Sequence, residues 1–291
     1  MSDFVLFTDS SADLSQEMVQ QAGVTVLPLT FTLQGETYSN YPDHREMDPA
    51  LFYDTLRAGE LATTSAVNVA DYTQAMEPIL KEGKDILVLA FSSGLSTTYN
   101  SACIAAEELK EAYPQRQIYV VDTLCASLGQ GLLVWLAAQE QKKGKSIQEV
   151  RDWAEANKQK VCHQFTVNDL YFLKRGGRIS ATTAVVGSML QIKPVLHVDA
   201  EGHLTSVSKA RGRNASIKAL VERMEKSVTE EGKQVVFISH GDCLEDAETL
   251  ANMIRERFGT QQICINYVGP VIGAHAGPGV LALFYLGNER Y

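Results

Sequence analysis

The hydrophobic positions of this chain follow two spacings in alternation. Short apolar runs, such as residues 4–9, 85–91 and 117–122, predict buried strands, and longer segments with helical spacing separate them. Residues 85–122 form one unit of strand, polar turn, helix and strand, whose right-handed crossover would make the two strands parallel neighbours. The pattern predicts an α/β protein with a mainly parallel sheet.

Capping signals predict where several helices begin. Ser146 and Glu149 have the spacing of a capping box, and Asp48 and Pro49 suit the N-cap and the first position of another helix. Residues 24–33, in contrast, carry the apolar and β-branched side chains of a strand, so we expect one continuous strand there.

The second half of the chain has a different expected topology. Residues 194–210 predict a hairpin, and residues 235–242 and 263–287 contain further strands. A hairpin next to these strands predicts a mixed sheet. We therefore expect two domains, residues 1–160 and 161–291, packed along a shared interface where ligand pockets often form.

Composition and charge narrow the classes of function. The chain has 291 residues, and 26 Lys and Arg against 35 Asp and Glu give a net charge of −9, which argues against nucleic acid as a partner. Five widely spaced cysteines without a C-x-x-C pair predict free thiols in a reducing cytoplasm. The acidic N-terminal segment argues against a signal peptide, and the lack of a long apolar run argues against a transmembrane helix.

Four stretches concentrate hydroxyls, glycines or histidine, and three of them stand where a helix should begin: residues 9–15, 62–68, 91–102 and 269–279. Helix capping alone would account for one hydroxyl at each place. The third stretch has five in one turn, namely Ser92, Ser93, Ser96, Thr97 and Thr98. Because strand ends and helix N-termini in such sheets favour anions, we expect them to hold a negatively charged group through neutral donors.

Among the histidines, His275 has the most distinctive setting. It stands between two glycines in a segment that is too rich in glycine for a helix, so we expect a loop there. A purely structural histidine is the alternative interpretation. His240 is the second candidate.

Two basic segments interrupt the acidic chain, at residues 173–180 and 209–216. Solvated surface is the simpler interpretation of such charges. A basic patch near a ligand could also steer an acidic protein partner or a phosphorylated ligand.

The signatures of an autonomous catalyst are missing from the sequence. No serine stands in a G-x-S-x-G elbow, and neither a phosphate-binding G-x-x-x-x-G-K-[ST] loop nor a dinucleotide-binding G-x-G-x-x-G follows a strand. The histidines and cysteines do not have the spacing of a metal site. We therefore expect no cofactor and no metal, and a binding protein rather than an enzyme.

Six motifs, taken in order, resemble the DegV family of bacterial fatty-acid-binding proteins. They are DSSADLS, TTSAVN, SSGLSTTYNSA, LYFLKRGGRIS, KPVL followed by KARGRNA, and GPVIGAHAGPG. Each motif alone is weak, but together they span nearly the whole chain in the order of the family.

The resemblance implies a fold and a role. The N-terminal domain would have α/β/α layers, and the C-terminal domain two layers with a mixed sheet. One long-chain fatty acid, such as palmitate, oleate or stearate, would lie buried in the protein. Its carboxylate would be presented to a separate ATP-dependent fatty acid kinase, which makes acyl-phosphate for phospholipid synthesis, and lipid exchange would involve transient contact with a membrane surface.

The resemblance also assigns roles to particular residues. The carboxylate-binding side chains of the family fall on Thr63, Thr64, Ser92, Ser93 and His275. Two basic positions suited to docking the kinase fall on Arg178 and Arg211. The chain departs from the family at residues 64–68, where many relatives read TSQPS, and at residues 96–98, where they read SGT, which bears on acyl preference.

Two other classes of function stay open on the sequence alone. One is an acyl-ester hydrolase or acyltransferase that uses Ser93 with His275, although no acidic third member is identifiable. The other is a small-molecule sensor with the same pocket but no kinase partner.

Overall fold

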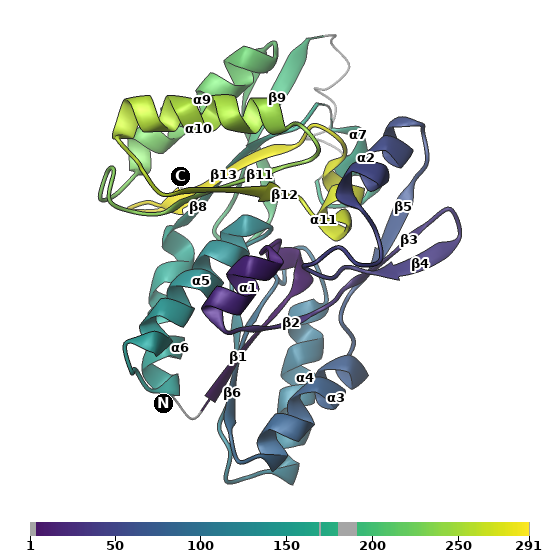
Figure 1. The fold of residues 1–291 in the computed structure, drawn as a ribbon, viewed down its shortest axis with the longest axis vertical. Helices are drawn as coiled ribbons and strands as arrows, with labels where there is room; N and C mark the ends of the chain where they lie inside the picture. Colours follow the sequence, from purple (N-terminus) through teal and green to yellow (C-terminus); the bar gives the residue numbers. More distant parts are fainter. Residues whose placement is uncertain (1–3, 169, 180–190, 291) are drawn as a thin grey trace.

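The computed structural model describes residues 4–168, 170–179 and 191–290. Helices lie on both faces of its first sheet (Figure 1). All neighbouring strands are parallel, in the order β2 (Thr25–Leu27), β1 (Phe4–Asp9), β6 (Asp85–Ala90) and β7 (Ile118–Asp122). The covering helices are α1 (Gln16–Ala22), α5 (Leu128–Lys142) and α6 (Ile147–Asn157), and on the opposite side α3 (Val69–Lys81) and α4 (Thr98–Ala112). The expected α/β/α layering with a parallel sheet is confirmed.

Strand β6 is apolar along its whole length because both faces of this sheet are covered. Leu87 and Leu89 pack into the cluster beneath α5 and α6, whereas Ile86 and Val88 pack into the cluster of α3 and α4. Successive side chains of a strand point to opposite faces, so a strand buried on both sides reads as a continuous apolar run.

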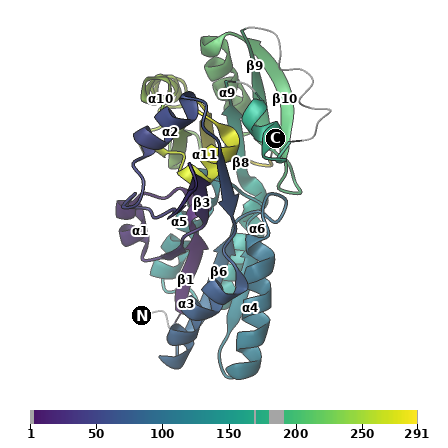
Figure 2. The ribbon, with the colours of Figure 1, turned by 90° about the vertical axis from the view of Figure 1, so that its right-hand side faces the viewer.

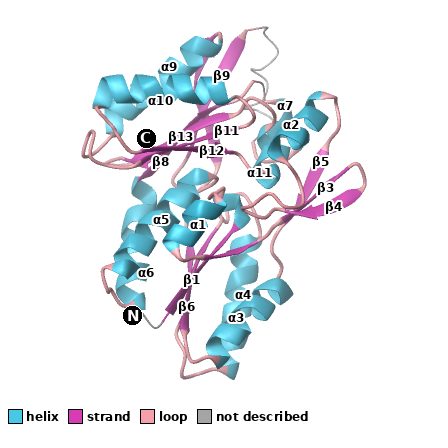
Figure 3. Cartoon of the chain, in the orientation of Figure 1, coloured by secondary structure: helices cyan, strands magenta, loops and turns pink. Residues whose placement is uncertain are grey.

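A small antiparallel sheet was not expected. It consists of β4 (Glu36–Ser39), β3 (Thr30–Leu33) and β5 (Ala62–Ser65), and α2 (Pro49–Arg57) lies close by (Figure 3). The single strand expected at residues 24–33 is wrong, because β2 and β3 are separate strands in different sheets. Pro28 stands between them, and proline lacks the amide hydrogen that a continuous strand would donate.

The third sheet is mixed, as predicted. Its strand order is β10 (Leu204–Arg211), β9 (Ile192–Val198), β8 (Val161–Thr166), β13 (Leu281–Leu286), β11 (Val236–His240) and β12 (Ile263–Tyr267). Only β11 and β12 are parallel among these pairs, and β9 and β10 form the predicted hairpin. Helices α9 (Arg213–Ser227) and α10 (Leu244–Phe258) cover one face of this sheet (Figure 1).

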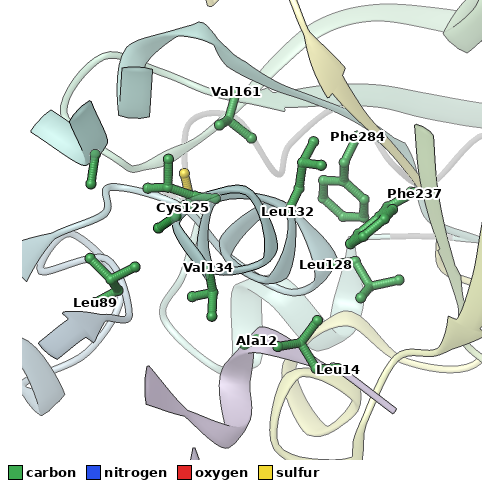
Figure 4. Packing of buried hydrophobic residues seen from close by; sticks show 14 of the residues in the cluster. Ala12, Leu14, Leu89, Cys125, Leu128, Leu132, Val134, Val161, Phe237 and Phe284 are labelled. Carbon is green, nitrogen blue, oxygen red and sulfur yellow. The ribbon is translucent and has the colours of Figure 1, made fainter. Parts of the chain in front are cut away.

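Helix α5 joins the two halves by packing between the parallel and the mixed sheet. Figure 4 shows Leu128 and Leu132 of α5 beside Phe237 and Phe284 of the mixed sheet. An added Cβ at Gly129 would lie 2.1 Å from His163 Nε2, so glycine permits this close approach. The division into domains at residue 160 stays a prediction, since one apolar cluster runs across it.

The segment around His275 is helical, which corrects the expected loop. Helix α11 (Pro270–Ala276) begins with proline at its first position and ends at Gly277, whose φ is +78°. Proline suits the first turn of a helix, and glycine suits the left-handed region just beyond the end. Helix α11 packs against α2, α7 (Tyr171–Arg175), β3 and β5 (Figure 2), so tertiary contacts outweigh the low helix propensity of glycine.

Short 3₁₀ helices, η1 (Ser10–Ala12) and η2 (Lys158–Lys160), complete the described elements. The predicted helix starts are confirmed: Ser146 and Glu149 make a reciprocal capping box, and the Asp48 side chain accepts the Leu51 amide.

Candidate functional site

A cavity of about 440 Å³ lies between the two halves of the molecule. This volume falls within the range of roughly 300–1,000 Å³ of ligand pockets in proteins. The N-terminal half and the C-terminal half both contribute walls, which are mostly apolar. The apolar lining side chains include Leu29, Phe91, Leu95, Phe165, Leu173, Val198, Leu204, Val268, Val271, Ile272, Val280 and Phe284.

A polar region of the cavity wall contains a hydrogen bond between two segments that are distant in the sequence. Thr64 of β5 lies with its Oγ1 2.7 Å from Nε2 of His275, in the last turn of α11. His275 Nδ1 is buried and has no hydrogen-bond partner within the described residues. Burial, and then the positive charges of Arg178 and Arg175, lower the pKa of His275 to about 4. The imidazole is therefore neutral at pH 7, and this region of the wall offers neutral hydrogen-bonding groups.

Arg178 adds a positive charge to the same region. Its side chain lines the cavity and donates to two backbone oxygens, from Nε to Leu95 O at 3.2 Å and from Nη1 to Gly176 O at 2.6 Å. Burial lowers the pKa of the guanidinium, which nevertheless stays charged at neutral pH. No carboxylate in the described part of the chain forms an ion pair with Arg178.

The two neighbouring serines after β6 have different surroundings. Ser92 is buried, and its hydroxyl donates to Gly202 O at 2.9 Å in the turn between β9 and β10. Ser92 Oγ also accepts a hydrogen bond from the Gly94 amide, at 3.2 Å. Ser93 is exposed and lines the cavity, and within the described residues its hydroxyl makes no hydrogen bond. The Ser93 hydroxyl is thus available to a ligand, whereas the Ser92 hydroxyl links the turn after β6 to the β9–β10 turn of the mixed sheet.

The structure brings together part of the predicted set. Thr64, Ser93, Arg178 and His275 all line the cavity. Thr63 is exposed, Ser92 is occupied by Gly202, and Arg211 is exposed at the end of β10, so none of these three is among the lining residues. The predicted roles of all seven residues stay predictions.

Ser127, His163 and Ser239 are polar lining residues that lie outside all the predicted polar stretches. Ser127 stands just before α5, where a lone serine reads as a helix cap, and the other two lie within apolar strands. Among the described residues there is no group of three or more side chains that could hold a metal ion. No described helix is long and apolar enough to cross a membrane.

The fold and the cavity define an α/β binding protein with an internal, largely apolar pocket. The sequence profile described as an uncharacterised protein of the DegV family matches residues 3–288, so the chain belongs to the DegV family.

Relatives with known sequences or structures extend this comparison. A DegV domain-containing protein of Clostridium perfringens is 50% identical over 290 residues, covering 100% of this chain and 99% of that protein. The structure of a DegV family protein of Thermus thermophilus, described for its fatty acid binding, has a TM-score of 0.88 at 30% identity and covers 98% of this chain and 99% of that one.

A third structure shares the fold at lower identity. The fatty acid kinase B3 protein of Streptococcus pneumoniae, loaded with linoleic acid, has a TM-score of 0.83 at 23% identity, covering 98% of this chain and 99% of that one. At this identity the likeness concerns the fold alone.

Replacing His275 with glutamine tests the low pKa of this histidine. The unfolded chain takes up a proton on His275 near pH 6.5, whereas the folded protein does so only near pH 4. The contribution of His275 to the free energy of unfolding therefore rises as the pH increases from about 4 to 6.5, and is constant above that window. Urea unfolding at several pH values should show that the stability difference, wild type minus His275→Gln, increases across this window. A difference that does not change with pH would contradict the lowered pKa of His275.

Proposed function

We propose that the protein binds one long-chain fatty acid, with the alkyl chain in the cavity and the carboxylate at Thr64, Ser93 and His275. The observation that carries the proposal is the cavity itself, which is lined mostly by apolar side chains and has a polar region around His275, supplied by β5, α11 and the turn after β6. A molecule that is apolar along most of its length and polar at one end matches this distribution.

The alkyl chain would provide most of the affinity. Burial of each methylene contributes roughly 0.8 kcal/mol, so a sixteen-carbon chain gains about 12 kcal/mol before the losses of association are subtracted. The carboxylate opposes binding, because its removal from water is unfavourable unless hydrogen bonds replace the lost hydration. The hydroxyls of Thr64 and Ser93 supply such bonds.

Arg178 would compensate part of the carboxylate charge. Two backbone oxygens already accept hydrogen bonds from its guanidinium, so Arg178 would act mainly as a nearby charge rather than as a tight ion-pair partner. A carboxylate held in this way keeps its oxygens accessible for reaction. This role adds to the docking role predicted from the resemblance, which Arg211, exposed at the end of β10, would share.

The reaction itself would be carried out by another protein. The chain has no nucleotide-binding motif, and the charged groups that shift the pKa of His275 are Arg178 and Arg175, with no carboxylate among them. Among the described residues, His275 therefore has no acidic partner of the kind that orients the histidine of a serine hydrolase. We infer that a separate ATP-dependent fatty acid kinase phosphorylates the bound carboxylate, which supplies acyl-phosphate for phospholipid synthesis.

Adjacent threonines provide a matched test of the carboxylate site. Thr64→Val keeps the shape of the side chain but removes the hydroxyl, so the affinity for palmitate or oleate should fall about tenfold, the value of one buried hydrogen bond. Thr63→Val makes the same change on an exposed neighbour and should bind as the wild type does. Displacement of a fluorescent fatty acid measures both. Equal losses in the two variants would contradict this position of the carboxylate.

A reconstituted reaction distinguishes a kinase subunit from an esterase. With bound oleate, ATP and the fatty acid kinase of the source organism, the protein should yield acyl-phosphate, trapped as the hydroxamate, and none when the kinase is omitted. Turnover of p-nitrophenyl esters by the protein alone, lost in Ser93→Ala, would instead establish the hydrolase alternative.

A further inference from the structure

A second group of polar side chains lies on the cavity wall, away from His275. Ser127 and Ser239 both line the cavity, and the Ser127 Oγ lies 2.6 Å from Asp13 Oδ2 and 3.0 Å from Ser239 Oγ. On the β13 side, the neighbours of Ser239 across the sheet are apolar, since Ala282 pairs with it and Phe165 pairs with Ala282, and both also line the cavity. On the β12 side, Ser239 pairs with Asn266, which is not among the lining residues. We call Asp13, Ser127 and Ser239 the serine–aspartate cluster.

Helix α11 sets the separation between the two polar regions. Asp13 Oδ1 accepts the Gly269 amide at 3.0 Å, just before α11, whereas His275 stands in the last turn of the same helix. Six residues at about 1.5 Å each separate the backbones of Gly269 and His275 by roughly 9 Å along the helix. A lipid whose carboxylate lies at His275 would therefore reach the serine–aspartate cluster with the middle of its chain.

The hydroxyl of Ser127 does not serve as a helix cap. Although Ser127 immediately precedes α5, its side chain makes no capping hydrogen bond. Its backbone has φ 52° and ψ −146°, a conformation that is unfavourable for any residue except glycine and that is frequent at functional sites. The strained backbone directs the hydroxyl to Asp13 and the cavity instead of to the first turn of the helix.

Asp13 is a buried carboxyl group without a cationic partner in the described part of the chain. Burial raises its pKa to about 7, although hydrogen bonds from Ser127 and Gly269 oppose the increase. Both protonation states are therefore populated near neutral pH. The hydrogen bonds of the cluster can run in either direction, because either serine can donate to the other.

Ser127 has the same unused hydrogen-bonding capacity in both protonation states of Asp13. If Asp13 is ionised, Ser127 donates to Asp13 and accepts from Ser239; if Asp13 is protonated, Ser127 accepts from Asp13 and donates to Ser239. A hydroxyl has one hydrogen and two acceptor positions. In both states, the Ser127 oxygen therefore keeps one acceptor position and has no hydrogen left to give.

We propose that Ser127, held by Asp13 and Ser239, binds a hydroxyl group carried in the middle of the acyl chain, so that the protein takes hydroxy fatty acids. The inference rests on the proposed function. Because Ser127 has only an acceptor position left, Ser127 binds a hydroxyl, which donates, and not a keto group, which does not. When Asp13 is ionised, the Ser239 hydrogen is also engaged, by Ser127, so the ionised cluster distinguishes the two groups.

The histidine on this part of the wall does not activate Ser127 as a nucleophile. Both ring nitrogens of His163 are occupied: its Nε2 accepts the Ala126 amide at 3.2 Å, and its Nδ1 lies 3.0 Å from Val161 O. Burial lowers the pKa of His163 well below its usual value. The neutral ring thus has no free nitrogen to accept a proton from Ser127.

Competition binding of stearic acid, its mid-chain hydroxy derivatives and the matching oxo derivatives tests this proposal. At least one hydroxystearic acid should bind the wild type as tightly as stearic acid does, or more tightly. The oxostearic acid with its keto group at the same carbon should bind more weakly than that hydroxystearic acid. Ser127→Ala should lower the ratio of hydroxystearate affinity to stearate affinity about tenfold, because one hydrogen bond is lost. Ser127→Gly, which relieves the backbone strain, provides the same test if the alanine variant folds poorly.

Ser227→Ala is the control, since Ser227 is a buried serine of α9 that does not line the cavity, and its affinity ratio should equal that of the wild type. If all hydroxystearic acids bind more weakly than stearic acid, with the same ratio in wild type and both Ser127 variants, the proposal is wrong and the cluster holds only water. Equal binding of oxo and hydroxy acids would overturn the assigned acceptor role. If stearic acid itself does not bind, the proposed function fails as well.

Discussion

The apolar cavity between the two halves is the constraint on which the rest of the structure depends. The protein folds around about 440 Å³ that its own side chains do not fill. The exposed residue Ser93 lies on the cavity wall, so water can enter, and water against a mostly apolar wall is unfavourable. Under the proposed function, the alkyl chain of the ligand would replace that water.

The polar region of the wall accounts for the kind of apolar ligand that fits. A pure hydrocarbon would leave Thr64 and His275 with only each other, whereas a carboxylate gives the hydroxyls an acceptor. Under the proposed function, the neutral imidazole and the partly occupied Arg178 would stabilise the acid without enclosing it in a strong ion pair. Tight burial of the alkyl chain and weaker retention of the carboxylate would then suit the proposed presentation of the ligand to a second enzyme.

Much of the architecture could be predicted from the sequence, because buried parallel strands and capped helices leave local signals. Strand β6 and the capping box at Ser146 are examples. The small antiparallel sheet and helix α11 could not be predicted, since both depend on contacts between distant segments. Glycine content argued against a helix at His275, yet packing against α2, α7 and β3 stabilises one.

The sequence pointed to segments that line the cavity, but it could not show which side chains of each segment face it. The motifs pointed to Thr63 and Thr64 alike, and only the pairing of β5 determines which of the two lies against His275. Ser92 and Ser93 differ in the same way, because the turn at Gly202 takes up the Ser92 hydroxyl. The serine–aspartate cluster could not be predicted as a group. Asp13 stands in the polar stretch of residues 9–15, but Ser127 and Ser239 are far from it in the sequence and stand where a helix cap and a strand residue are expected.

The most direct measurement of the central claim is a mass spectrum of the organic extract from protein purified without denaturant. The account predicts long-chain fatty acid in about equimolar amount with the protein. Protein that is empty in repeated preparations, and that does not take up added palmitate or oleate, would contradict it.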